Sequence, residues 1–143
     1  MAKGFSDSER IALVALQTKL FKGFTYRYDK DKHGKVEYWE KIAQYDINQT
    51  SIRFNGDCEE FAMHALAGAR QMGLNARLIY CLTELNEGHC ICEVISKDQT
   101  QALFLDNRYR KPMTRSELSK YKFVKMSPLN PVAGDKRPWY LVK

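Results

Sequence analysis

Three short apolar runs, separated by turns of only four or five residues, restrict the fold of this chain more than any other feature of its sequence. The runs lie at about 76–83, 88–96 and 101–106, and each is rich in aliphatic and aromatic residues. Polar residues at 83–87 and 97–100 supply the turns. Apolar runs joined by such short connections pair as antiparallel strands. The sequence therefore predicts an antiparallel sheet.

Two helix patterns precede these strands. Residues 6–9 have the form of a capping box and start a helix over about 7–22, which we expect to close near Gly23. A second helix is expected over about 58–72, and Gly73 is well suited to end it. The second helix carries alanine on one face, so it can pack closely on a sheet.

The remaining segments complete the domain. Residues 24–28 are β-prone but short, and 121–124 and 139–142 are expected as edge or closing strands. A chain of 143 residues that is 44% hydrophobic can bury one core and has little room for a second. We therefore expect residues 1–143 to form a single α+β domain, with helices packed on an antiparallel sheet.

Composition narrows the function classes. No apolar run approaches the roughly 20 residues that a membrane helix needs, and the start lacks a secretory signal pattern, so we expect a cytoplasmic protein that does not bind membranes. Four cysteines in that compartment are expected to be free thiols. The net charge of +6 comes without a nucleic-acid motif, and such an excess usually marks a solvated face, so we do not expect nucleic-acid binding.

A thiol, an imidazole and a carboxylate follow one another along the chain. Cys58 lies in Gly-Asp-Cys-Glu at a predicted helix start, His89 follows Gly88 on a strand, and Asp106 ends the next strand. A cysteine in the first turn of a helix lies near the positive end of the dipole, which favours the thiolate. These three residue types are those of a nucleophile, its base and the group that orients the base.

Strand pairing tests this arrangement. If residues 98–99 form a two-residue turn, the numbers of paired residues sum to 197 and Ile91 faces Asp106. His89 then lies on the same face, one diagonal step from Asp106, within reach of its side chain. A register shift of one residue would place the two on opposite faces.

Other interpretations use the same residues. Each motif on its own is commonly structural, because a strand histidine is most often a core or surface residue and Asp-Asn after a strand often starts a turn. His64 lies about 240° around the helix from Cys58, so it is not its partner. A metal site at His89, Cys90 and Cys92 is disfavoured, because adjacent strand residues point to opposite faces.

The ordered set of motifs resembles the bacterial transglutaminase-like cysteine proteinases, a branch of the papain-like and transglutaminase-like superfamily. The motifs run from Tyr28-Asp29, Gly34 and Tyr38-Trp39 through 56–62 and Leu74 to Gly88-His89 and 105–107. The resemblance implies a Cys58–His89–Asp106 triad that cleaves a protein substrate through a thioester and needs no cofactor for the chemistry. The backbone N–H of Cys58 would stabilise the oxyanion, together with a donor from the region of Trp39 or Asn55.

The resemblance also implies a candidate calcium site. Members that cleave surface adhesins bind calcium through acidic residues beside the nucleophile, which here are Asp57, Glu59 and Glu60. Alternatively, Asp57 caps the helix and the two glutamates complement its dipole. Residues 29–40 also match parts of an EF-hand loop, but His33 is a poor ligand and we expect no helix over 24–28 before it.

Three function classes remain open. The triad serves hydrolysis by a cysteine peptidase and acyl transfer to an amine, as in transglutaminases or amidases, and no residue decides between water and amine. A catalytically idle binding module of the same fold is the third. The periplasmic members carry a signal sequence and are longer, so a compact chain would suit a phage or mobile element.

Overall fold

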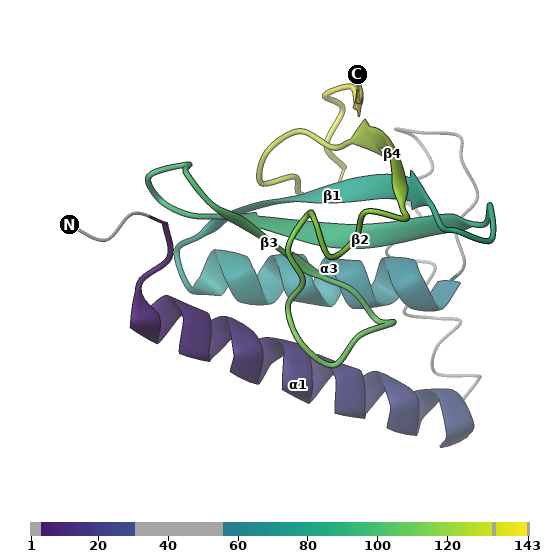
Figure 1. Ribbon diagram of the computed structural model, residues 1–143, viewed down its shortest axis with the longest axis horizontal. Helices are drawn as coiled ribbons and strands as arrows, with labels where there is room; N and C mark the ends of the chain where they lie inside the picture. Colours follow the sequence, from purple (N-terminus) through teal and green to yellow (C-terminus); the bar gives the residue numbers. More distant parts are fainter. Residues whose placement is uncertain (1–3, 31–55, 133, 143) are drawn as a thin grey trace.

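The computed structural model describes residues 4–30, 56–132 and 134–142 (Figure 1). Two described helices precede five strands in the chain. The helices are α1 (Asp7–Lys30) and α3 (Gly56–Gln71). The strands are β1 (Asn75–Leu82), β2 (Gly88–Ile95), β3 (Ala102–Leu105), β4 (Lys122–Met126) and β5 (Tyr140–Leu141). The predicted α+β fold is confirmed, and so are the three strands predicted between residues 76 and 106.

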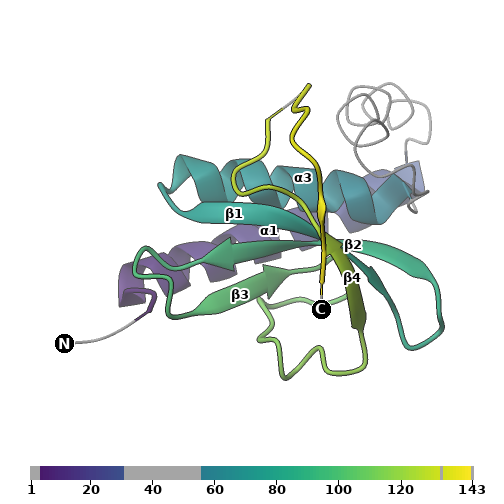
Figure 2. The ribbon, with the colours of Figure 1, turned by 90° about the horizontal axis from the view of Figure 1, so that it is seen from above.

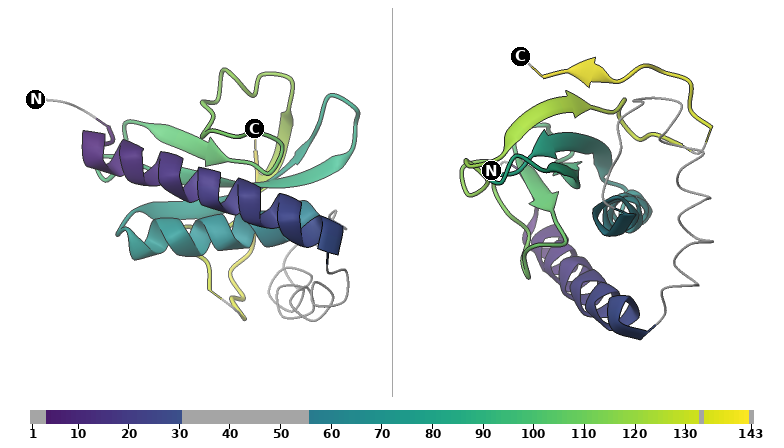
Figure 3. Two further views of the ribbon diagram at one scale, coloured as in Figure 1. Left: turned by 90° about the horizontal axis from the view of Figure 1, so that it is seen from below. Right: turned by 90° about the vertical axis from the view of Figure 1, so that its right-hand side faces the viewer.

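The five strands form one antiparallel sheet in the order β3-β2-β1-β4-β5. Helix α3 packs on β1 and β2, and α1 packs on α3. Figure 2 shows both helices on the same side of the sheet, and Figure 3 shows the sheet curving over α3. The domain is therefore layered, with the described helices on one face of a twisted sheet.

Helix α1 begins where the capping box predicts. The backbone N–H of Glu9 donates to Ser6 Oγ at 3.1 Å, and the backbone N–H of Ser6 donates to Glu9 Oε1 at 2.9 Å. The predicted end near Gly23 is wrong, because α1 continues to Lys30. A glycine in a helix costs only about 1 kcal/mol, and extending an existing helix costs far less than starting one, so the β-prone residues 24–28 continue it.

The extension of α1 bears on the EF-hand alternative. The expectation of no helix before residues 29–40 is wrong, since α1 runs up to the start of that segment and includes its first two residues. Residues 31–40 lie outside the described part of the chain. His33, at the fifth position of the loop, remains a poor ligand for calcium.

The β2–β3 hairpin has the predicted register. Cys92 pairs with Leu105 and Ile95 pairs with Ala102, so paired numbers sum to 197. The turn itself is longer than predicted. The backbone N–H of Ser96 bonds the carbonyl of Gln101 at 2.9 Å, which leaves four residues in the turn rather than two. The register survives because both turns are centred on the same point.

Each face of the sheet carries its own core cluster. The helix-side core combines residues of α1 and α3 with alternate strand residues such as Ala76, Cys90 and Leu103. The opposite-face core contains the intervening strand residues, among them Ile79 and Ile91. The chain between β3 and β4 contributes Met113, Leu118 and Tyr121 to this second core, so it covers the face away from the helices.

Candidate active site

His89 and Asp106 meet as the strand register predicts. His89 Nε2 lies 2.7 Å from Asp106 Oδ1. Both side chains are buried, with His89 5% exposed and Asp106 fully enclosed. Since a carboxylate can only accept, Nε2 carries the proton, and the lone pair of the imidazole is on Nδ1. Nδ1 is therefore available as a base, while the contact between Nε2 and Asp106 holds the ring in place.

Asp106 accepts two further hydrogen bonds. The backbone N–H of Arg108 donates to Oδ1 at 3.0 Å, and the Tyr121 hydroxyl donates to Oδ2 at 2.7 Å. The Tyr121 ring also packs edge-on against the ring of His89, with centroids 5.6 Å apart at 76°. A buried carboxylate is costly unless hydrogen bonds satisfy it, and Asp106 has three such bonds.

Cys58 lies in the first turn of α3 and is 2% exposed. In Figures 1 and 2 the amino end of α3 lies at the same end of the domain as the β1–β2 turn, which leads directly into His89. The Cys58 side chain belongs to the helix-side core, whereas His89 pairs with Cys81 of the opposite-face core and so lies on that face. The helix dipole at this position favours a thiolate.

Cys81 is a fully buried thiol on the strand next to His89. It pairs with His89 across β1 and β2, so the two side chains lie on the same face. Burial raises the pKa of the Cys81 thiol, and the charges of Asp106 and Cys58 raise it further. All four cysteines are free thiols.

The side chain of Gln17, in α1, holds the backbone that follows β3 in place. This side chain is fully buried, and its Nε2 donates to the carbonyl of Asp106 at 2.8 Å and to that of Tyr109 at 2.6 Å. The first helix therefore holds the segment that presents the Asp106 carboxylate.

Most of the residues expected at the oxyanion and calcium sites cannot be placed. Trp39 and Asn55 lie outside the described residues, as does the side chain of Asp57. Glu59 and Glu60 are each 2% exposed in the first turn of α3. Within residues 4–30, 56–132 and 134–142, no three His, Cys, Asp or Glu side chains converge as a metal-binding group.

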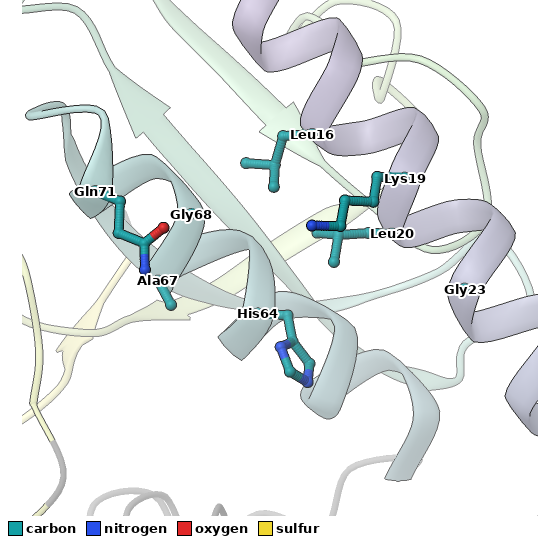
Figure 4. A pocket seen from close by; sticks show the side chains of 8 residues that line it. All are labelled: Leu16, Lys19, Leu20, Gly23, His64, Ala67, Gly68 and Gln71. Atoms are coloured by element: carbon teal, nitrogen blue, oxygen red, sulfur yellow. The ribbon is translucent and has the colours of Figure 1, made fainter.

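His64 lies in a different part of the domain. It lines a groove of about 450 Å³ between α1 and α3, together with Leu16, Lys19 and Leu20 of the first helix (Figure 4). The groove is narrow at Gly68, where a Cβ atom would come within 2.6 Å of Leu16. The structure thus places His64 in this groove rather than in the contact between His89 and Asp106.

Two residues around Asp106 carried no signal in the sequence. Gln17 and Tyr121 are separated from Asp106 by 89 and 15 positions, and only tertiary contacts bring them to it. The backbone bond from Arg108, two positions away, belongs to the turn that Asp-Asn after a strand often starts. None of the described helices is long and apolar enough to cross a membrane.

A family model and solved structures support the same fold. The model of the transglutaminase-like superfamily matches residues 2–103. No curated protein matches the sequence. The structure is similar to calcium-bound LapG of Legionella pneumophila, with 17% identity and a TM-score of 0.50 over 96% of this chain and 82% of that one. It is equally similar to EGTA-treated LapG, with 17% identity and a TM-score of 0.50 over 97% and 80% of the two chains.

Proposed function

This chain belongs to the transglutaminase-like superfamily, and on that premise we propose that it is a cysteine peptidase with Cys58 as nucleophile, His89 as base and Asp106 as the group that orients the base. The observation that carries the proposal is the buried contact of 2.7 Å between His89 Nε2 and Asp106 Oδ1. It prepares the imidazole to use Nδ1 as the base. The position of Cys58 at the start of α3 supports its role as the nucleophile.

The chemistry follows from these groups. His89 Nδ1 takes the proton from Cys58 Sγ, and the thiolate attacks a peptide carbonyl to form a tetrahedral intermediate. The imidazolium then protonates the leaving amine as the C–N bond breaks, which leaves a thioester on Cys58. Asp106 stabilises the imidazolium throughout. A water molecule, deprotonated by His89, hydrolyses the thioester and restores the thiol.

Stabilisation of the oxyanion falls to backbone donors. The backbone N–H of Cys58 would be one donor, because it lies at the amino end of α3, where the helix dipole favours negative charge. The region of Trp39 or Asn55 would supply a second donor. If an amine rather than water resolves the thioester, the same residues perform acyl transfer.

Thiol reactivity tests the proposal without a known substrate. We expect iodoacetamide to alkylate Cys58 at pH 6 at least about tenfold faster than free cysteine, because the reference thiol is almost wholly protonated at that pH. His89→Ala should remove the advantage. Peptide mapping by mass spectrometry assigns the modified cysteine. Equal rates for the unmutated protein, His89→Ala and free cysteine would refute the triad.

Substrate capture tests the peptidase activity itself. Cys58→Ala removes the nucleophile and should retain the bound protein substrate, which mass spectrometry identifies after capture from host lysate. The identified protein, incubated with the unmutated chain, should be cut at one site and should remain intact with Cys58→Ala. Incorporation of an added amine at that site, without cleavage, would instead favour acyl transfer.

Calcium beside the nucleophile is the second part of the proposal. Asp57, Glu59 and Glu60 would hold it, and their carboxylate oxygens are the donors that calcium prefers. Glu59 and Glu60 are both buried, and a bound cation would compensate their charge, as the amino end of α3 also does. The calcium-bound structure of LapG, a protein with this fold, supports the same interpretation.

Isothermal calorimetry separates the calcium alternatives. We expect heat on adding calcium to the unmutated protein and none with Asp57→Ala. Asp29→Ala serves as the matched control, since Asp29 opens the EF-hand-like segment at 29–40. Loss of heat in Asp29→Ala alone would move the site to that segment. No heat with the unmutated protein would dismiss both sites.

A further inference from the structure

We propose that Tyr121 is a positioning residue of this site. Its hydroxyl holds Asp106 Oδ2 so that Oδ1 faces His89, and Arg108 sets the direction of that hydroxyl. The inference rests on the proposed triad and adds to it a layer of residues that orient the carboxylate.

The donor and acceptor roles are determined by chemistry. Arg108 Nη1 lies 3.0 Å from Tyr121 Oη, and a guanidinium can only donate. The hydroxyl oxygen therefore accepts from Arg108, and its own proton is left to bond another group. Asp106 Oδ2, at 2.7 Å, is that group. Arg108 thus fixes the hydroxyl rotor of Tyr121 in the orientation that Asp106 needs.

The carboxylate is held from both of its oxygens. Oδ1 accepts from His89 and from the backbone N–H of Arg108, while Oδ2 accepts from Tyr121. Without Tyr121, both remaining bonds fall on Oδ1, and rotation about the Cβ–Cγ bond has no restraint at Oδ2. Tyr121 is therefore the described side chain that holds the second carboxylate oxygen, and with the bonds at Oδ1 it sets the plane of the carboxylate.

Tyr121 remains a donor under all ordinary conditions. It is 3% exposed, and burial raises the pKa of its phenol well above the ordinary value, with the Asp106 carboxylate raising it further. The phenol is therefore protonated across the physiological pH range. The edge-on contact with His89 means that one side chain restrains both the imidazole and the carboxylate.

Arg108 is itself anchored. Its guanidinium forms two hydrogen bonds to the Glu84 carboxylate, at 2.5 and 3.2 Å, and lies 5.4 Å from the Tyr121 ring centroid. Glu84 lies in the turn between β1 and β2, the turn that leads into His89. A continuous chain of contacts thus runs from Glu84 through Arg108 and Tyr121 to Asp106.

The test uses Tyr121→Phe, which removes one oxygen atom and keeps the ring. In ¹⁵N-labelled protein there are three histidines, and comparison with His89→Ala assigns the imidazole signal of His89. We expect the His89 Nε2–H proton to be protected from solvent exchange, and Tyr121→Phe to accelerate that exchange at least about tenfold. Cys58 alkylation at pH 7 should slow by about tenfold, corresponding to about 1.4 kcal/mol.

Controls separate positioning from general loss of structure. The amide protons of β2 should exchange at unchanged rates in Tyr121→Phe. Tyr140→Phe, which changes an exposed tyrosine of β5, should match the unmutated protein in both measurements. Should Tyr121→Phe fail to fold, Arg108→Met removes the guanidinium from a partly exposed site and should shift both readings in the same direction by a smaller amount.

Each outcome has a definite meaning. Faster ring-proton exchange and slower alkylation, with unchanged β2 amides, support the positioning role. If Tyr121→Phe matches the unmutated protein in both measurements, the positioning role is overturned and the triad is left intact. If Tyr121→Phe does not fold, an Arg108→Met variant that matches the unmutated protein in both measurements has the same meaning. Cys58 that reacts equally fast in His89→Ala refutes the proposed function instead, and the inference fails with it.

Discussion

Gln17 offers the sharpest test of how the first helix supports the site. Its amide donates to two backbone carbonyls beyond β3, those of Asp106 and Tyr109, while its Oε1 has no hydrogen-bond partner among the described residues. We predict that Gln17→Met destabilises the fold modestly and that Gln17→Glu destabilises it strongly, although glutamate is the closer match in shape.

The magnitudes follow from the contacts. Gln17→Met removes two hydrogen bonds at about 1 kcal/mol each, and it also removes a buried acceptor without a partner, which returns about 1 kcal/mol. The net loss is then about 1 kcal/mol. Gln17→Glu turns a carboxylate toward two carbonyl oxygens in a site with no solvent exposure. Protonating a carboxyl of ordinary pKa at pH 7 costs about 4 kcal/mol, which is the expected loss.

Urea denaturation at pH 7 and pH 5 measures both losses. The carboxyl introduced by Gln17→Glu has a pKa raised in the folded state, so the folded protein binds more protons than the unfolded chain and stability recovers as the pH falls. Gln17→Met should show no such recovery relative to the unmutated protein. The reasoning is refuted if Gln17→Glu is as stable as the unmutated protein at pH 7, or if both variants lose the same amount.

Three further predictions concern other contacts. The buried Ser127 hydroxyl accepts one backbone N–H and donates to one carbonyl, both at 2.9 Å, so Ser127→Ala should cost about 2 kcal/mol in urea denaturation, and a loss below about 0.5 kcal/mol would contradict this. The Arg108 guanidinium lowers the pKa of Glu84 to about 2, so the stabilising contribution of that carboxylate, present at neutral pH, is lost as the pH falls toward 2. Carboxyl NMR titration should show this pKa returning toward 4.5 in Arg108→Met. Burial raises the pKa of the Cys81 and Cys92 thiols, so neither should react with iodoacetamide at pH 8 until the protein is unfolded. Alkylated Cys81 or Cys92 in a peptide map of the native protein would contradict this prediction.

Local sequence patterns predicted the secondary structure well where a clear signal marks the start or the end of a helix. Gly73, at a φ of 79°, ends the segment after α3, and the capping box starts α1. Gly23 was misleading because a glycine signals a helix end only when the following residues favour another structure or a left-handed turn. Residues 24–30 favour neither another structure nor a left-handed turn strongly enough, so α1 continues to Lys30.

The sequence by itself determined the sheet register, and with it the meeting of His89 and Asp106, because a period of two along each strand and a turn centred at 98–99 leave only one pairing. It also determined that Cys58 lies in the first turn of a helix. Only the tertiary structure decided what surrounds the carboxylate. Gln17 and Tyr121 reach Asp106 because α1 and the chain after β3 pack around the same strand end, and no local pattern encodes contacts between segments so far apart in the chain.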